Sequence, residues 1–135
     1  MGSLNQGPIE VHRFDGAKLR RVSIRPHSPR ELVTWNDIAI NEPRCYAGFQ
    51  EVRPGDPAES WVMWFDEIQY ALSGSANLIY RMPPLFNEEY TLNLSAGDLF
   101  LLPLGCDFTW EVIGDEPFRT VIAALPYPPN LQLFE

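Results

Sequence analysis

The chain has 135 residues, with 10 basic and 18 acidic side chains and a formal net charge of −8. Its length is that of one domain, and a hydrophobic content of 45% is that of a globular chain with a core. So acidic a sequence without a basic cluster argues against nucleic acid and anionic membranes as partners. No apolar run approaches the ~20 residues of a membrane helix, and residues 1–6 lack a secretory signal pattern. We therefore expect a cytoplasmic protein in which Cys45 and Cys106 are free thiols.

Prolines and glycines divide the chain into short apolar runs, which is typical of an all-β protein. Residues 1–43 are expected to form an N-terminal arm with short strands at 11–14 and 20–24, while residues 31–35 remain ambiguous between a helical turn and a strand. Residues 44–126 form the expected core, with strands at 44–52, 61–72, 76–81, 89–94, 99–102, 108–113 and 118–125. Residues 127–135 are expected to be a tail, because the prolines at 126, 128 and 129 cannot continue a sheet interior. Roughly eight evenly spaced strands in one small domain predict a sandwich or barrel.

Two segments carry family-like motifs. Residues 64–74 contain an aromatic-Asp-Glu-Ile run, ending at Ile68, and close on Gly74; residues 97–105 read Gly-Asp, four apolar residues and Pro-x-Gly. This order and spacing resembles the two motifs of the cupin superfamily, over about residues 47–126. Within that superfamily Trp61 and Ala96-Gly97-Asp98 are most similar to the ethanolamine-utilisation protein Q-like cupins. The resemblance implies an RmlC-like, single-domain jelly-roll barrel with an N-terminal arm.

The resemblance also implies where a cupin metal would be held: by two histidines before the motif glutamate, by that glutamate, and by a later histidine. Glu67 is retained, but residues 60–63 before it contain no histidine and the later position is Phe108. His12 and His27 lie in the arm, where we expect them to be solvated. One carboxylate does not hold a transition metal, so we expect no cofactor and no standard cupin metal site. A nonstandard site of Glu67, Gln69 and a tyrosine stays open.

Strand alternation indicates which side chains share the inner face. If no bulge interrupts residues 61–71, the odd-numbered side chains lie together, and the resemblance places Glu67 inside. The catalytic candidates are Glu67, Gln69 and Tyr80. The ligand-binding candidates, for which core packing is the competing interpretation, are Tyr46, Phe49, Trp61, Met63, Phe65, Phe108 and Trp110. Gln50 and Asn77 stay open because the register is not fixed.

An aromatic cavity with one carboxylate is typical of a small-molecule site. Desolvation should raise the pKa of Glu67 and suit it to acid–base work, and we expect a metal-independent enzyme of isomerase or lyase type. The alternatives are a non-catalytic ligand-binding or sensory cupin, in which Glu67 is only structural, and an acyl-phosphate activity like that linked to the ethanolamine-utilisation relatives. No glycine-rich phosphate loop is present and Lys18 is the only lysine, which disfavours the last. We also expect a homodimer, because the strand-like pattern at 21–24 could extend a neighbour's sheet.

Overall fold

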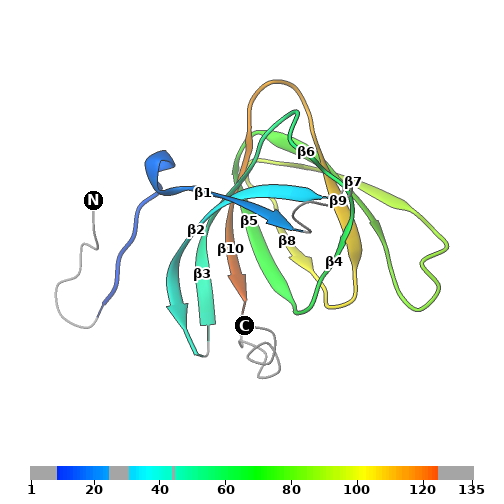
Figure 1. Cartoon of the computed structure of the whole chain (residues 1–135), viewed down its shortest axis with the longest axis horizontal. Coiled ribbons are helices and arrows are strands. Elements are labelled where there is room, and N and C mark those ends of the chain that lie inside the picture. Colours follow the sequence, from blue (N-terminus) through cyan, green and yellow to red (C-terminus); the bar gives the residue numbers. More distant parts are fainter. Residues whose placement is uncertain (1–8, 25–30, 44, 125–135) are drawn as a thin grey trace.

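The computed structural model describes residues 9–24, 31–43 and 45–124, which form an almost entirely β structure (Figure 1). Its elements, in chain order, are the 3-10 helix η1 (Gly16–Lys18) and the strands β1 (Arg20–Ile24), β2 (Leu32–Glu42), β3 (Cys45–Val52), β4 (Trp61–Val62), β5 (Glu67–Ser73), β6 (Ser75–Arg81), β7 (Tyr90–Ser95), β8 (Leu99–Leu102), β9 (Asp107–Val112) and β10 (Phe118–Ala124). Within these residues no helix has the length and apolar character needed to span a membrane.

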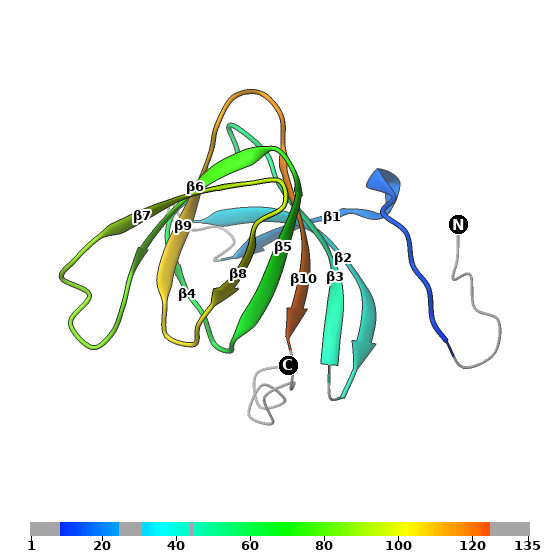
Figure 2. The same cartoon turned by 180° about the vertical axis from the view of Figure 1, so that it is seen from behind.

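Two antiparallel sheets build the barrel. The larger has the strand order β1-β2-β3-β10-β5-β8 and the smaller β4-β9-β6-β7. Figures 1 and 2 show the two sheets curving around a common interior. This arrangement confirms the expected all-β jelly roll.

The core lies between the two inner faces because the strands alternate as half-buried strands should. In β5 the buried and exposed side chains strictly alternate from Glu67 to Leu72, and in β10 every second residue from Phe118 is buried. The facing sheet contributes Leu78 and Trp110 to the same core cluster. Both cysteines are free, and Cys106 is among the buried residues.

Most of the expected strands are present, but the N-terminal third and residues 61–72 differ. The ambiguous segment at 31–35 opens β2, which spans 11 residues and pairs with both β1 and β3. The strand expected at 11–14 does not form. The long strand expected at 61–72 is interrupted: β4 ends at Val62 and β5 begins at Glu67.

Two glycines allow close approaches that shape the barrel. At Gly48, a Cβ would lie 2.0 Å from the carbonyl oxygen of Asp37, where β2 shifts register against β3. Gly74 joins β5 to β6 with a φ of +79°, and a Cβ there would lie 2.3 Å from the carbonyl oxygen of Pro117. Gly74 therefore serves both the tight turn and the contact with the strand entering β10.

Candidate functional site

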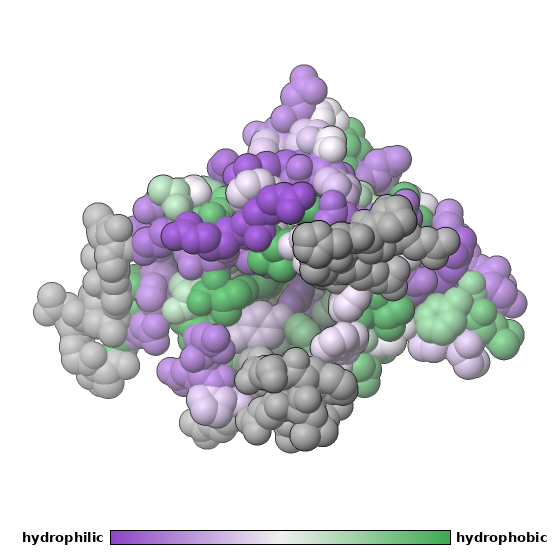
Figure 3. Space-filling model, viewed as in Figure 1, coloured by the Kyte–Doolittle hydropathy of each residue, from purple (hydrophilic) through white to green (hydrophobic). Residues whose placement is uncertain are grey.

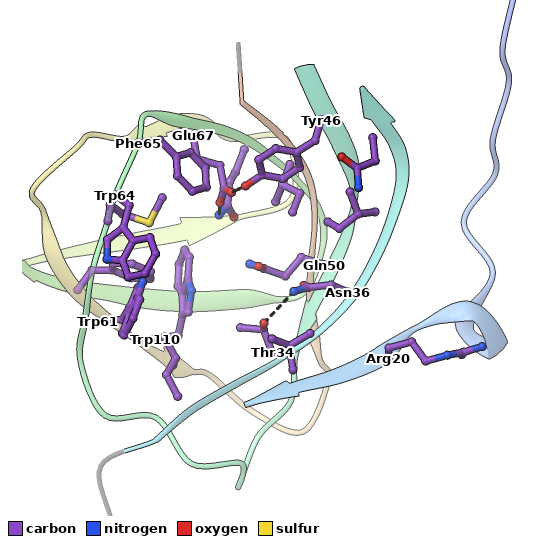
Figure 4. Close-up of a pocket in the computed structure, with 18 residues that line it drawn as sticks. Arg20, Thr34, Asn36, Tyr46, Gln50, Trp61, Trp64, Phe65, Glu67 and Trp110 are labelled. Carbon is purple, nitrogen blue, oxygen red and sulfur yellow. Dashed lines mark hydrogen bonds between the residues drawn. The ribbon is translucent and has the colours of Figure 1, made fainter. Parts of the chain in front are cut away.

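A cavity of about 600 Å³ opens inside the barrel (Figure 4). Figure 3 shows apolar side chains near the centre of one face of the molecule, bordered by hydrophilic ones. The cavity is lined by Arg20, Val22, Leu32, Thr34, Asn36, Ile38, Asn41, Tyr46, Gln50, Trp61, Met63, Trp64, Phe65, Glu67, Gln69, Phe108, Trp110 and Ile122.

Among the lining residues in the described part of the chain, Glu67 is the only acidic one. It is the first residue of β5, and the alternation of that strand turns both Glu67 and Gln69 inward. The side chain is held at both oxygens. Tyr46 donates its hydroxyl to Oε2 at 2.5 Å, and Gln69 donates Nε2 to Oε1 at 2.8 Å. Since Glu67 is only 6% exposed, two protein donors replace most of the water that would solvate it.

The balance of these effects raises the pKa of Glu67. Burial is the largest contribution and raises it, while the hydrogen bonds from Tyr46 and Gln69 favour the carboxylate and lower it in part. A carboxyl group in this state can hold a proton at a higher pH than a solvated one and can also release it. Burial and geometry together therefore suit Glu67 to proton transfer.

A second cluster of polar side chains lines the cavity on β2 and β3, away from Glu67. Asn36 and Thr34 come from β2 and Gln50 from β3, and Asn36 donates Nδ2 to the hydroxyl of Thr34 at 3.1 Å. Figure 4 shows these three side chains grouped below the Tyr46–Glu67 pair. The lining thus has two polar ends, of which only one carries a carboxyl group.

Aromatic rings form much of the remaining wall. The rings of Trp61 and Trp64 lie 5.5 Å apart, and the ring of Phe65 meets Tyr46 edge-on at 5.6 Å. On the facing sheet, Phe108 and Trp110 are in edge contact at 6.1 Å. These aromatic rings offer apolar faces to a bound ligand and exclude water from the ligand's apolar surface.

The loop between β4 and β5 positions part of the aromatic wall of the cavity. Met63 is hydrogen-bonded by its backbone to Gly105 and Cys106, each at 2.9 Å. Asp66 accepts the backbone N–H of Leu104 at 2.8 Å. Asp66 therefore fastens the loop to the Pro-x-Gly turn, and the loop brings Trp64 and Phe65 into the lining.

Eight of the ten predicted site residues lie together in the lining: Tyr46, Trp61, Met63, Phe65, Glu67, Gln69, Phe108 and Trp110. Gln50, which the register left open, also lines it, whereas Asn77 binds Glu111 on the exposed side of the smaller sheet. The roles predicted for these residues stay predictions.

Phe49 and Tyr80 are not in the lining. In β3 the inward positions include Tyr46 and Gln50, so Phe49 faces the other side, where its ring meets Phe14 edge-on at 5.7 Å. Tyr80 lies on β6, where it packs against the core cluster, and its ring stacks on Tyr90 of β7 at 5.3 Å. Strand register explains why Phe49 does not line the cavity, and the position of β6 beside β7 explains why Tyr80 does not.

The lining side chains from β1, β2 and the loop that interrupts residues 61–72 were not predicted from the sequence. The missed polar residues are Arg20, Thr34, Asn36 and Asn41, and the missed aromatic residue is Trp64. Residues 32, 34, 36 and 38 follow a period of two that could have revealed one inward face of β2. Trp64 carries no such signal, because an uninterrupted strand would turn it outward.

The donor set does not fit a cupin metal. In the ranges described by the structure, no three His, Cys, Asp or Glu side chains come together as a metal site would need. Beside Glu67 stand a phenol and an amide, and at the expected histidine positions Trp61, Met63 and Phe108 face the cavity. His12 pairs instead with Glu10 at 2.5 Å, outside the cavity, and His27 lies outside the described residues.

Comparison with solved structures identifies the fold. The ethanolamine utilization protein Q of Salmonella typhimurium LT2 aligns with a TM-score of 0.54 at 18% identity, over 82% of this chain and 97% of that one. An RmlC-like cupin protein of Methanocaldococcus jannaschii, with a double-stranded β-helix fold, aligns with a TM-score of 0.59 at 11% identity, over 84% and 96%. A point mutant of Bacillus subtilis oxalate decarboxylase OxdC aligns with a TM-score of 0.54 at 25% identity, over 71% of this chain and 26% of that one.

These likenesses show that the chain has the cupin jelly-roll fold, as its two motifs predicted. No protein-family model and no curated protein matches the sequence. The fold is shared with enzymes, among them a decarboxylase by name. Because one fold hosts many chemistries, the activity has to be argued from the cavity itself.

Proposed function

We propose that this protein is an enzyme of isomerase or lyase type that acts on a small organic molecule in the barrel cavity, with Glu67 as the general acid and base. The observation that carries the proposal is a buried carboxyl group on the wall of a cavity of about 600 Å³, held at both oxygens. A volume of that size is ordinary for a small-molecule site.

In this proposal the Glu67 carboxylate removes a proton from a carbon atom beside the ligand's carbonyl group. The electron pair left behind moves toward the carbonyl oxygen. The protonated Glu67 then returns the proton to a neighbouring atom, which gives an isomer, or to a departing hydroxyl group, which gives an elimination. Tyr46 and Gln69 keep the carboxyl group in place for both steps, and the aromatic wall excludes water that would compete for the proton.

Solvent deuterium exchange tests this chemistry across a class of compounds and does not require that the substrate be identified first. The purified protein is incubated in D₂O with a panel of carbonyl compounds that carry an α-hydrogen: aldoses, ketoses and 2-keto acids. Proton NMR then follows the loss of each α-hydrogen signal. We expect catalysed exchange for at least one compound, and a loss of ~10²–10⁴ in its rate for Glu67→Gln. Glu116→Gln, which changes an exposed glutamate in a turn, is the matched control.

Elemental analysis of the same samples distinguishes the metal-free mechanism from a metal-dependent one. Stoichiometric Zn, Fe, Ni or Mn that is present in the wild type and lost in Glu67→Gln would replace the metal-free mechanism by a nonstandard site. Full exchange activity in Glu67→Gln would also refute the role of Glu67.

A non-catalytic ligand-binding role is the second candidate, favoured by the many aromatic rings in the lining. It predicts saturable binding with no exchange and no loss of ligand on prolonged incubation. An acyl-phosphate activity has less support, since Arg20 is the only cationic side chain among the described residues of the lining and its guanidinium is engaged elsewhere. Hydrolysis of acetyl phosphate, abolished in Arg20→Gln, would reverse that ranking.

A further inference from the structure

Gln50 places an unpartnered amide group on the wall of the cavity. It lies on β3, is 7% exposed and lines the cavity, and its amide forms no hydrogen bond in the described part of the chain. The side-chain atoms there that are both fully enclosed and unpartnered are Asn36 Oδ1, Gln69 Oε1, Asp107 Oδ1 and Thr120 Oγ1. The amide atoms of Gln50 are not among them, so its donor and its acceptor both border the open cavity.

The polar neighbours of Gln50 in the larger sheet do not use its amide. Gln50 lies opposite Asn36 of β2 and Thr120 of β10. Asn36 donates its amide nitrogen to Thr34 at 3.1 Å, and among the described residues the hydroxyl oxygen of Thr120 has no partner. Figure 4 shows Gln50 extending away from the Asn36–Thr34 pair into the space bordered by the labelled aromatic side chains. A buried amide turned toward a cavity costs free energy until a ligand or a water molecule pairs with it.

Gln50 and the Tyr46–Glu67 pair mark two separate points of the wall. Tyr46 and Gln50 are four residues apart on β3, so that ~14 Å separates their Cα atoms at ~3.4 Å per residue. Both side chains line the cavity, and because the sheet curves around the interior (Figure 1), their ends lie closer together than their Cα atoms. A ligand that meets Glu67 at one end can therefore meet Gln50 only several bonds further along its skeleton.

We propose that Gln50 binds the far end of the substrate and thereby selects its length. The substrate is a carbonyl compound whose reacting carbon lies at Glu67 and whose chain carries a hydroxyl group at the Gln50 amide. A hydroxyl group fits this position because it can accept from Nε2 and donate to Oε1, and both amide atoms are free. The rings of Trp61 and Trp110 offer apolar surface to the intervening chain. The position of the reacting carbon rests on the proposed function, whereas the binding role of Gln50 does not.

Hydroxy ketones of increasing length, each with its parent ketone, test this selection. The parent compounds are butanone, pentanone and hexanone with the carbonyl group at the second carbon, and each hydroxy probe adds a hydroxyl group on the last carbon. Each compound is titrated into nitrogen-labelled protein and followed by two-dimensional proton–nitrogen NMR, with the side-chain amide signal of Gln50 assigned by triple-resonance spectra. We expect one hydroxy probe to bind about three- to tenfold more tightly than its parent, which is the gain from one hydrogen bond, and to shift the Gln50 amide signal at saturation.

Two variants remove the hydrogen bond and keep an apolar side chain of similar size. In Gln50→Met and Gln50→Leu the advantage of the hydroxy probe over its parent ketone should disappear, while the parent ketone binds within about twofold of its wild-type affinity. Asn77→Leu, on the exposed side of the smaller sheet, should retain the full advantage. Circular dichroism shows which variants fold, and the Gln50 amide signal of the wild type carries the test if neither does.

Several results would overturn the inference: an equal gain from the hydroxyl group at all three lengths, a gain that survives in a folded Gln50 variant, or a Gln50 amide signal that does not move. Failure of every hydroxy probe to bind at concentrations on the order of 10 mM would do the same. The two proposals fail separately. A hydroxy ketone that binds through Gln50 without Glu67-dependent deuterium exchange refutes the enzyme, whereas exchange that is lost in Glu67→Gln but gains nothing from the hydroxyl group refutes the role of Gln50.

Discussion

Replacing Tyr46 by Phe should raise the pKa of Glu67 further. The substitution removes one hydroxyl group, which donates to Glu67 Oε2 at 2.5 Å, and leaves the ring against Phe65. A hydrogen bond to a charged acceptor contributes ~1.5–3 kcal/mol, and one to a neutral acceptor ~0.5–1.5 kcal/mol. Removing the Tyr46 hydroxyl therefore destabilises the ionised form of Glu67 more than its protonated form. The pKa of Glu67 should therefore rise above its value in the wild type, because the carboxylate loses more stabilisation than the neutral carboxyl group does.

The same change should make the stability of the variant depend on pH over a wider range. Since the native pKa of Glu67 lies above its ordinary value of 4.5, its contribution to stability is fully present below that pH and is lost as the pH rises through the native pKa. In Tyr46→Phe this loss continues to a higher pH. The difference in unfolding free energy between wild type and variant should thus be ~0.5–1.5 kcal/mol in acid and widen to ~1.5–3 kcal/mol once the wild-type carboxyl group has ionised.

Urea unfolding from pH 4 to pH 9 measures this difference directly. Tyr70→Phe is the matched control: Tyr70 lies on the same strand as Glu67 but is 44% exposed on the outer face. It should show a small difference that does not change with pH. A constant or narrowing difference for Tyr46→Phe would refute the reasoning, because it would mean that the Tyr46 hydroxyl does not respond to the charge of Glu67.

Three further predictions concern the scaffold. Gly74→Ala should cost about 2–4 kcal/mol of unfolding free energy, from backbone strain and a clash with Pro117; Gly97→Ala, which has a positive φ but open space, should cost ~1 kcal/mol. Glu51 is held by two arginines at 2.5 and 2.6 Å, and although burial alone would raise its pKa, they bring it below 4.5. Glu51→Gln should therefore cost ~1–2 kcal/mol at neutral pH, a difference that shrinks in urea unfolding as the pH falls below 4.5. A homodimer stays a prediction, and we now expect the exposed apolar outer face of β5 and β8 to be its interface. Light scattering should give a mass of twice 15.4 kDa for the wild type and that of a monomer for Leu101→Glu.

Fold class was predictable because the signals that define it are local and repeated. Alternation, proline and glycine punctuation and two motif-like turns each constrain a short segment, and together they indicate one barrel. Glu67 and Gln69 could be placed inward for the same reason, since β5 alternates without interruption.

What could not be predicted depends on contacts between distant segments. The interruption at residues 63–66 is held by hydrogen bonds to Leu104, Gly105 and Cys106, some 40 residues further along the chain. The position of Tyr80 depends on its stacking with Tyr90, and the polar end at Asn36 depends on the long β2 joining the larger sheet. Periodicity within one segment carries no information about such partners.

Glu67 is linked to Tyr46 and Gln69 by one hydrogen bond at each carboxyl oxygen. While Glu67 is ionised, Oε2 accepts the Tyr46 hydroxyl and Oε1 accepts Nε2 of Gln69. A protonated carboxyl group keeps one acceptor oxygen, so a proton on Oε2 leaves the contact with Gln69 unchanged. The Tyr46 hydroxyl can both donate and accept, so it can receive that proton's hydrogen bond without a movement of its ring. The arrangement around Glu67 therefore accommodates both protonation states of the carboxyl group.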